Sequence, residues 1–391
     1  MKSLYKILLI FVLIFISTIS LTSYHNKISE NTLSTIDPTL KRSLLLTPEL
    51  IEEYNIKLKE ILIKHDFQGN ITLCLSGKLI FQQSSGYADI QNKLKNDSCT
   101  VFQLASVSKQ FTAMAVAILK EKGMLSYDDF VVKYIPEFPY PDITIRHLLN
   151  HTSGLQNYVW LIENKWNKKT PPDNEDLIDM FIENPLPLNF HPGTKFSYSN
   201  TGYAFLASLI QRVSGKLYHV FLKETIFDVL GMNDTYVIHK LYADLIPNKA
   251  KGYVRRGGRY VHYEDDFNDG IVGDKGIYST TDDLLKWDAA LYSDVLVPQK
   301  SIEEMFVKNI TLKGDSFNYG LGWRLPKEDN VKMVYHNGWW HGYRCTLRRY
   351  TNDKNTLIIL NNTNKNIFPL VHEIENLMYP NIIQDTLLNG E

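Results

Sequence analysis

A serine and a lysine three residues apart are the first group in this chain that could do chemistry. Lys109 is the first residue of a helix-like stretch, 109–122, and Ser106 lies just before that stretch. Residues three apart on a helix share a face, so the lysine amine can reach the serine hydroxyl. A serine hydroxyl is a weak nucleophile at neutral pH and needs such a base. By itself this pair is a weak signal, because a capping serine followed by a surface lysine gives the same pattern.

Two further groups lie far along the chain. The segment Tyr198-Ser199-Asn200 follows a Pro-Gly turn and precedes a helix-like run, 201–213. It offers a phenol for proton transfer and an amide that can hold a substrate carbonyl. The segment His336-Asn337-Gly338 lies at the end of a strand-like run, where a glycine would let an edge strand approach a substrate backbone closely.

In this order and at these spacings, Ser106-x-x-Lys109, Tyr198-x-Asn200 and His336-x-Gly338 resemble the motifs of the superfamily of class C β-lactamases, penicillin-binding proteins and serine esterases. Residues 144–155, 230–232 and 273–280 resemble further segments of that family. The resemblance covers roughly residues 48–380. It implies a β-lactamase/transpeptidase-like fold and a serine hydrolase that works through an acyl-enzyme intermediate.

The resemblance also implies a role for each site residue. Ser106 becomes acylated, and Lys109 and Tyr198 form the acid–base pair. The substrate-binding positions are Asn200, His336, Gly338 and Trp339. The backbone N–H groups of Ser106 and Trp339 form the oxyanion hole, and Asn200 holds the substrate amide or the lysine. No metal and no cofactor is implied, and Tyr198 is expected to activate the deacylating water.

One departure concerns the substrate. β-Lactamases of this type usually have lysine where this chain has His336, and histidine is mostly neutral at pH 7. Recognition of the carboxylate of a β-lactam should weaken, and the histidine resembles the peptidase, D-aminopeptidase and esterase branches. The aromatic residues Trp339, Trp340 and Tyr343 either pack the strand or form an apolar acyl or aryl pocket.

The expected substrate is therefore a small ester, D-amino-acid peptide or amide, with peptidoglycan-derived molecules among the candidates. Two alternatives stay open. One is a true class C-type β-lactamase, since the same Ser-Lys-Tyr groups act on any of these carbonyls. The other is a non-catalytic, penicillin-binding-like protein that binds peptidoglycan or a partner protein.

The elements that must position these residues follow an irregular order. Strand-like runs occur near both ends of the chain, at 69–75, 78–84, 332–335, 345–350 and 356–360. Helix-like stretches occupy 49–65, most of 130–250, and 368–378. This order predicts an α+β fold in which an antiparallel sheet takes strands from both chain ends, is flanked by helices, and has a mainly helical lobe inserted.

The first residues differ from the rest. Lys2 and Lys6 precede an apolar run, 7–16, and then small hydroxyl residues. This pattern is typical of a signal peptide, although a retained N-terminal anchor stays open. We expect a signal peptide or membrane anchor over 1–23, a tether over 24–47, the hydrolase domain over 48–380 and a C-terminal tail over 381–391. The protein is thus expected to be exported to the periplasm or cell envelope.

Composition excludes several other classes. The formal net charge of -1 gives no field for nucleic acid. The three cysteines form no C-x-x-C pair, so they suggest neither a metal knuckle nor a disulfide framework, although one disulfide stays open. His147 and His151 are four apart but have no clear third metal ligand. No G-x-S-x-G of an α/β-hydrolase occurs.

Overall fold

The fold was analysed in a computed structural model, which describes residues 46–238, 245–327 and 332–379. The chain divides into two units, residues 1–51 and 52–391, and the site discussed below lies wholly in the second. The predicted export segment, most of the tether and the C-terminal tail lie outside the described residues. Within the described residues, no helix combines the length and the apolar character that a membrane crossing requires.

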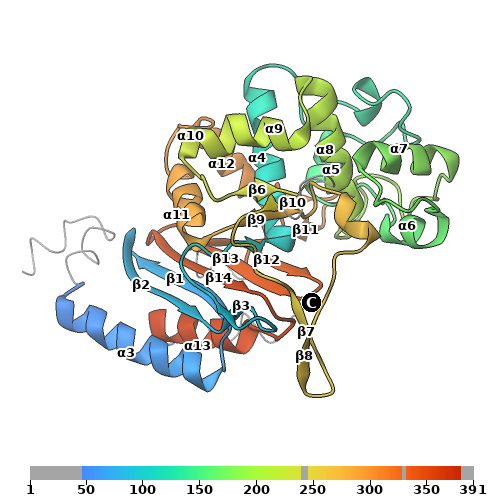
Figure 1. The fold of residues 1–391 in the computed structure, drawn as a ribbon. Helices are drawn as coiled ribbons and strands as arrows, with labels where there is room; N and C mark the ends of the chain where they lie inside the picture. Colours follow the sequence, from blue (N-terminus) through green and yellow to red (C-terminus); the bar gives the residue numbers. More distant parts are fainter. Residues whose placement is uncertain (1–45, 239–244, 328–331, 380–391) are drawn as a thin grey trace, which may run out of the picture. The chain divides into compact units, whose positions relative to one another are not determined.

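A five-stranded antiparallel sheet joins the two ends of the chain (Figure 1). Its strand order is β12-β13-β14-β1-β2. The strands span Gly69–Leu75 (β1), Lys78–Ser85 (β2), Met333–Trp340 (β12), Tyr343–Tyr350 (β13) and Asn355–Asn361 (β14). β1 and β14 are buried along their whole length, because helices cover both faces of the sheet. This confirms the predicted antiparallel sheet with strands from both ends.

One strand is longer than predicted. We expected a strand over 332–335 with the third motif at its end, whereas β12 continues through that motif to Trp340. The sequence did not predict this continuation, because glycine and asparagine in the third motif have a low intrinsic preference for strands. In the structure, pairing with β13 along the whole of β12 outweighs that local preference. The third motif is therefore held by the sheet itself.

Helices α3 (Pro48–Lys64) and α13 (Phe368–Met378) agree closely with the predicted terminal helices. The helical lobe lies between β2 and β12 in the sequence. Its α-helices are α4 (Lys109–Glu121), α5 (Ile145–Leu149), α6 (Val159–Lys165), α7 (Asn174–Glu183), α8 (Asn200–Ser214), α9 (Tyr218–Leu222), α10 (Asp228–Leu230), α11 (Thr281–Ala290) and α12 (Gln299–Met305). Shorter helical turns are η1 (Ala105–Ser108), η2 (Val131–Lys133), η3 (Lys223–Phe227) and η5 (Phe267–Gly270).

Helix α4 is the centre of this lobe. Every residue from Lys109 to Leu119 is buried, and the helix packs against α8. A helix that is apolar nearly all round is stable only when surrounded by protein. The one charged side chain in that buried stretch is Lys109, which makes its environment decisive for the chemistry.

Small sheets connect the lobe to the central sheet. β9 (Ile277–Ser279) lies between β5 (Phe102–Gln103) and β6 (Tyr236–Val237). Because β5 directly precedes η1, this pairing brings the loop before β9 to the start of α4. The remaining pairs are β3 (Tyr87–Asp89) with β4 (Leu94–Lys95), β7 (Tyr253–Arg256) with β8 (Arg259–His262), and β10 (Asn309–Ile310) with β11 (Ser316–Phe317).

Two of the cysteines occupy strands, as expected. Cys74 lies in β1 and Cys345 in β13, and both are buried. Burial raises the pKa of each thiol to about 12. Both therefore remain protonated and act as small apolar side chains.

Candidate active site

Ser106 lies in the single turn of 3-10 helix that leads into α4. The residue before it, Ala105, has a φ of 49°, in the left-handed region that non-glycine residues rarely adopt. Strain of this kind costs on the order of 1–3 kcal/mol and is kept only where the surroundings enforce it. Ser106 is half-buried and lines a pocket of about 430 Å³. The turn thus presents the serine hydroxyl to this pocket.

Lys109 points back at this serine, as the helical spacing predicts. Its Nζ lies 3.1 Å from Ser106 Oγ, and it donates to Asn200 Oδ1 at 2.9 Å and to the backbone carbonyl of Asp274 at 2.8 Å. The side chain is fully buried. The pKa of Lys109 is lowered to about 7, chiefly by burial, while the Asp274 carboxylate opposes the shift and the nearby Arg324 adds to it. Near neutral pH a large fraction of the amine is therefore unprotonated.

The partners of Lys109 determine where its lone pair points. A neutral amine has two N–H donors and one lone pair, whereas the Asn200 and Asp274 carbonyl oxygens can only accept. With both N–H groups donated to these two oxygens, the lone pair faces the Ser106 hydroxyl. Lys109 is therefore arranged to take the proton of Ser106.

Tyr198 reaches the same pocket from the segment before α8. The Lys109 ammonium lies 5.0 Å from the centre of the Tyr198 ring. A buried histidine holds this segment, since Ser199 N–H donates to His151 Nδ1 at 3.1 Å and the His151 and Tyr198 rings are 4.3 Å apart. Burial and neighbouring cations keep the pKa of His151 well below its usual range, so it remains a neutral acceptor.

In the sequence, His147 and His151 were weighed as metal ligands, although both lie in the segment 144–155 that resembles the family. The structure instead shows that His147 caps α5, where its Nδ1 accepts from the Thr144 N–H at 3.2 Å. His151 lies beyond the end of that helix, with a φ of 63°. Because the helix ends between them, the two imidazoles do not share a helical face. Each imidazole instead accepts a hydrogen bond from a backbone N–H, that of Thr144 for His147 and that of Ser199 for His151.

The third motif lies on β12, the edge strand of the central sheet. The N–H and C=O of Tyr335 both bond to Arg324, on the side away from β13. In an antiparallel strand, the backbone N–H and C=O groups of every second residue point to the same side. The N–H of Trp339, four residues after Tyr335, therefore also faces away from β13. Gly338, Trp339 and Ser106 line one pocket. This orientation agrees with the oxyanion role that the resemblance implies for Trp339.

Gly338 allows β12 to lie directly against the nucleophile segment. A Cβ atom at this position would be 2.2 Å from the Leu104 carbonyl oxygen and 3.2 Å from Ala105 Cβ. We expected a glycine here to let the strand approach a substrate backbone. The close contact in the structure is instead with the backbone that carries Ser106, which fixes β12 relative to the nucleophile.

His336 is not among the residues that line the pocket. It is completely buried, with Nε2 3.0 Å from Tyr319 Oη and Nδ1 2.7 Å from the Asn337 carbonyl. Burial and the cations Arg324 and Lys109 hold its pKa well below the usual range. The neutral form that we expected is therefore supported, but its contacts are with protein and its predicted substrate contact stays a prediction.

Two arginines that the sequence did not single out line the pocket instead. They are Arg324, over the Tyr198 ring at 5.1 Å, and Arg344, over the Trp339 ring at 3.7 Å. Neither lies in a motif, and only their strand pairing next to β12 brings them here. The pocket residues are Ser106, Tyr198, Asn200, Arg324, Asn337, Gly338, Trp339, Arg344, Cys345, Asn366, Ile367 and Phe368.

Of the three aromatic residues near the third motif, only Trp339 faces the pocket, and it is 61% exposed. Trp340 Nε1 instead donates to Asp269 at 2.6 Å, and Tyr343 Oη donates to the Ala250 carbonyl at 2.7 Å. Successive strand residues point to opposite faces, which separates Trp339 from Trp340. Of the two alternatives left open, packing against the protein holds for Trp340 and Tyr343, whereas Trp339 lines the pocket.

Comparison with known proteins agrees with this geometry. Residues 68–377 match the family model described as Beta-lactamase. A penicillin-binding protein of Bacillus subtilis (strain 168) is 38% identical over 311 residues, which cover 76% of this chain and 69% of that protein. The solved octameric penicillin-binding protein homologue from Pyrococcus abyssi has a TM-score of 0.71 at 26% identity, covering 84% of this chain and 77% of its own.

A penicillin-binding protein from Bacillus halodurans shares the fold, with a TM-score of 0.72 at 24% identity over 82% of this chain and 98% of its own. The α+β fold, the three motifs and the family model thus agree over most of the sequence. The chain belongs to the beta-lactamase family and has the fold that this family shares with penicillin-binding proteins.

Proposed function

We propose that this protein is an exported serine hydrolase that forms an acyl-enzyme on Ser106, with Lys109 and Tyr198 as its acid–base pair. The observation that carries the proposal is the buried Lys109 amine, whose pKa of about 7 and three fixed partners direct it at the serine hydroxyl. A base is most useful when its pKa lies near the working pH.

In acylation, Lys109 takes the hydroxyl proton and Ser106 Oγ attacks the substrate carbonyl. The negative charge that develops on the carbonyl oxygen is held by the N–H groups of Ser106 and Trp339. Tyr198 passes a proton to the leaving group as the carbonyl–leaving group bond breaks. In deacylation, the Tyr198 phenolate takes a proton from water, which attacks the carbonyl of the acyl-enzyme ester. The bond to Ser106 Oγ then breaks, and Lys109 returns the proton that it took, so that the free Ser106 hydroxyl is restored.

We predicted weak carboxylate recognition because His336 supplies no cation, but cations from elsewhere in the pocket favour a substrate with a free carboxylate. Arg324 and Arg344 both line the pocket, and a guanidinium binds a carboxylate through two parallel hydrogen bonds. The Trp339 and Phe368 side chains supply apolar surface. We therefore infer a small peptide, amide or ester of a D-amino acid that ends in a carboxylate, as a peptidoglycan fragment does.

A true β-lactamase is the second candidate, because β-lactams also carry a carboxylate that these arginines could bind. Intact-protein mass spectrometry after exposure to D-peptides, esters and β-lactams separates the two. We expect a transient mass increment on Ser106 from a D-peptide or ester, and a long-lived increment from a β-lactam. Rapid nitrocefin turnover, at about 10⁶ M⁻¹s⁻¹ or above, would favour the β-lactamase. No increment from any member of the panel would contradict the hydrolase.

Replacing Arg324 with glutamine should change the preference between matched substrates. We expect kcat/KM for a carboxylate-ended D-peptide ester to fall by about tenfold or more relative to its C-terminal amide, because one charge-assisted hydrogen bond contributes roughly 1.5–3 kcal/mol. The loss of a cation near Lys109 also raises the pKa of that lysine, but this affects both substrates alike. An equal fall in kcat/KM for the carboxylate-ended substrate and for its C-terminal amide would exclude carboxylate binding by Arg324.

A further inference from the structure

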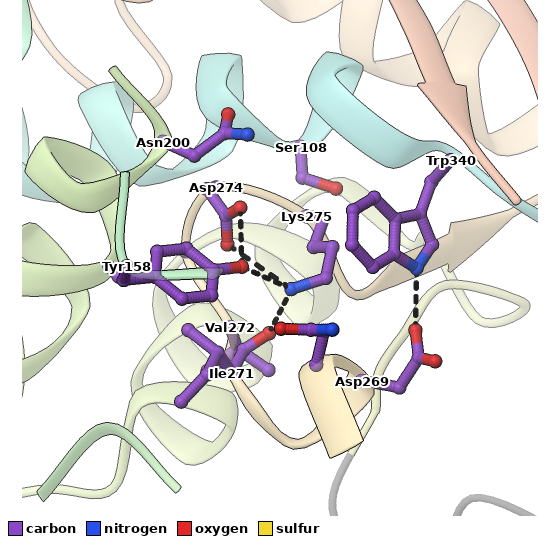
Figure 2. Close-up of polar contacts among 12 residues, drawn as sticks. Ser108, Tyr158, Asn200, Asp269, Ile271, Val272, Asp274, Lys275 and Trp340 are labelled. Atoms are coloured by element: carbon purple, nitrogen blue, oxygen red, sulfur yellow. Dashed lines mark hydrogen bonds and ion pairs between the residues drawn. The ribbon is translucent and has the colours of Figure 1, made fainter. Parts of the chain in front are cut away.

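A second, buried group of charges lies next to Lys109. The side chains of Asp274 and Lys275 are 1% and 3% exposed, and Lys275 Nζ is 3.7 Å from Asp274 Oδ1. Tyr158 bridges them, since its hydroxyl accepts from Lys275 Nζ at 2.6 Å and donates to Asp274 Oδ2 at 3.0 Å. Figure 2 shows this arrangement. The mechanism above uses none of these three side chains.

This buried group contacts Lys109 and two residues that lie next to the site in the sequence. The backbone carbonyl of Asp274 is the acceptor that fixes one N–H of Lys109. The N–H of Tyr158 donates to Thr201 Oγ1 at 2.9 Å, next to Asn200. Lys275 lies over the Trp340 ring at 4.7 Å, at the end of β12 (Figure 2). One buried group thus links α4, the start of α8 and the third-motif strand.

The Asp274 carboxylate has few direct partners within this group. In the described part of the chain, Asp274 Oδ1 has no hydrogen-bond donor, and its nearest cation is Lys275 at 3.7 Å. Burying a carboxylate with so few partners costs stability. Its negative charge lies close enough to favour the protonated form of Lys109.

We propose that Asp274 and Lys275, bridged by Tyr158, are positioning residues for Lys109. They hold the carbonyl that orients its amine and place one buried negative charge behind it. This role rests on the proposed function of Lys109 as a base. The other charged or titratable groups that face Lys109 are Arg324, Tyr198, Tyr203, His151 and His336.

Asp274→Asn keeps the backbone carbonyl and removes the carboxylate charge. The attraction that stabilises the Lys109 ammonium is lost and the Lys275 cation is left uncompensated, so both changes lower the pKa of Lys109. We expect the titration midpoint of the Lys109 13Cε signal, in protein labelled with [13C]lysine, to fall by about half a pH unit or more. The signal is assigned with Lys109→Met. The acid limb of kcat/KM should shift to lower pH by the same amount.

A variant with both substitutions, Asp274→Asn with Lys275→Met, is the second test. Replacing a buried ion pair by neutral side chains of similar size is often harmless to stability, so this variant should fold if the single one does not. Its Lys109 midpoint should lie between those of wild type and Asp274→Asn. Glu375→Gln is the matched control, because it breaks the buried Arg348–Glu375 pair (2.9 Å) on α13. It should lower the unfolding temperature and leave the Lys109 midpoint in place.

The proposed role of this buried group would be overturned if the Lys109 titration midpoints of the folded variants equalled the wild-type value within about 0.2 pH units. A shift in Glu375→Gln as large as that in Asp274→Asn would also overturn it, since general loosening would then be the cause. Failure of the proposed function is distinguishable. It would show as absence of turnover and of acylation in the wild type, whereas the NMR titration reports on Lys109 without any substrate.

Discussion

Ser106→Ala is expected to abolish hydrolysis of any substrate that the wild type turns over, with kcat falling by about 10³-fold or more. The Ser106 hydroxyl lines the pocket and is the only nucleophile toward which the Lys109 amine points among the described residues. The variant should remain folded, because Ser106 is half-buried and its loss leaves Lys109 two further partners. Steady-state kinetics and intact-protein mass spectrometry check the result together.

The neighbouring serine of the same motif supplies a control. Ser108 is buried and its Oγ accepts from the Ile277 N–H at 3.2 Å, so it supports β9 and does not face the pocket. Ser108→Ala should lower stability but still become acylated. If Ser106→Ala kept more than about a tenth of wild-type kcat in a preparation free of other hydrolases, the nucleophile would have to be another residue.

Tyr198→Phe should lower kcat by about 10²-fold or more, the usual range for the loss of a general acid–base group. The phenylalanine keeps the ring that packs against His151 and Lys109, so the packing is retained while the hydroxyl that transfers the proton is removed. The effect is measured as kcat on substrates with good and poor leaving groups. The loss should be larger for the poor leaving group, which depends more on a proton from Tyr198.

Tyr203 provides the matched control. It lies on α8, its hydroxyl donates to the Leu149 carbonyl at 2.6 Å, and its ring is 5.5 Å from Lys109 Nζ. Tyr203→Phe should cost about 1 kcal/mol of unfolding free energy and retain most of kcat. Equal activity in Tyr198→Phe and Tyr203→Phe would mean that Lys109 transfers both protons.

The groups that could be predicted from the sequence are those encoded by local spacing. Ser106 and Lys109 are one helical turn apart, and the β1–β2 hairpin is marked by its Ser-Gly turn. Both are short-range patterns. The antiparallel sheet followed from the order of strands and helices, and the family resemblance placed Tyr198 and Gly338 in the same site.

What could not be predicted depends on contacts between distant segments. Arg324 lies in the pocket because its backbone pairs with Tyr335. His151 acts through Ser199, and Asp274 acts through a carbonyl that no sequence motif reports. The role of His336 was inferred from the resemblance of the third motif and from the charge of histidine, and its burial against Tyr319 became clear only with the strand in place. The roles of all these residues stay predictions until the variants are measured.

The pairing of β1 with β14 also has a consequence for how this protein folds. Asn70 pairs with Leu360, so the central sheet cannot close until nearly the whole chain is available. Proteins dominated by such non-local pairing fold slowly, because the entropy of loop closure is lost before the stabilising contacts between distant segments can form. Until then the β1–β2 hairpin has an unpaired edge, which is prone to aggregation. For the export that we propose, such a delay would keep the chain unfolded until its last strands have been made.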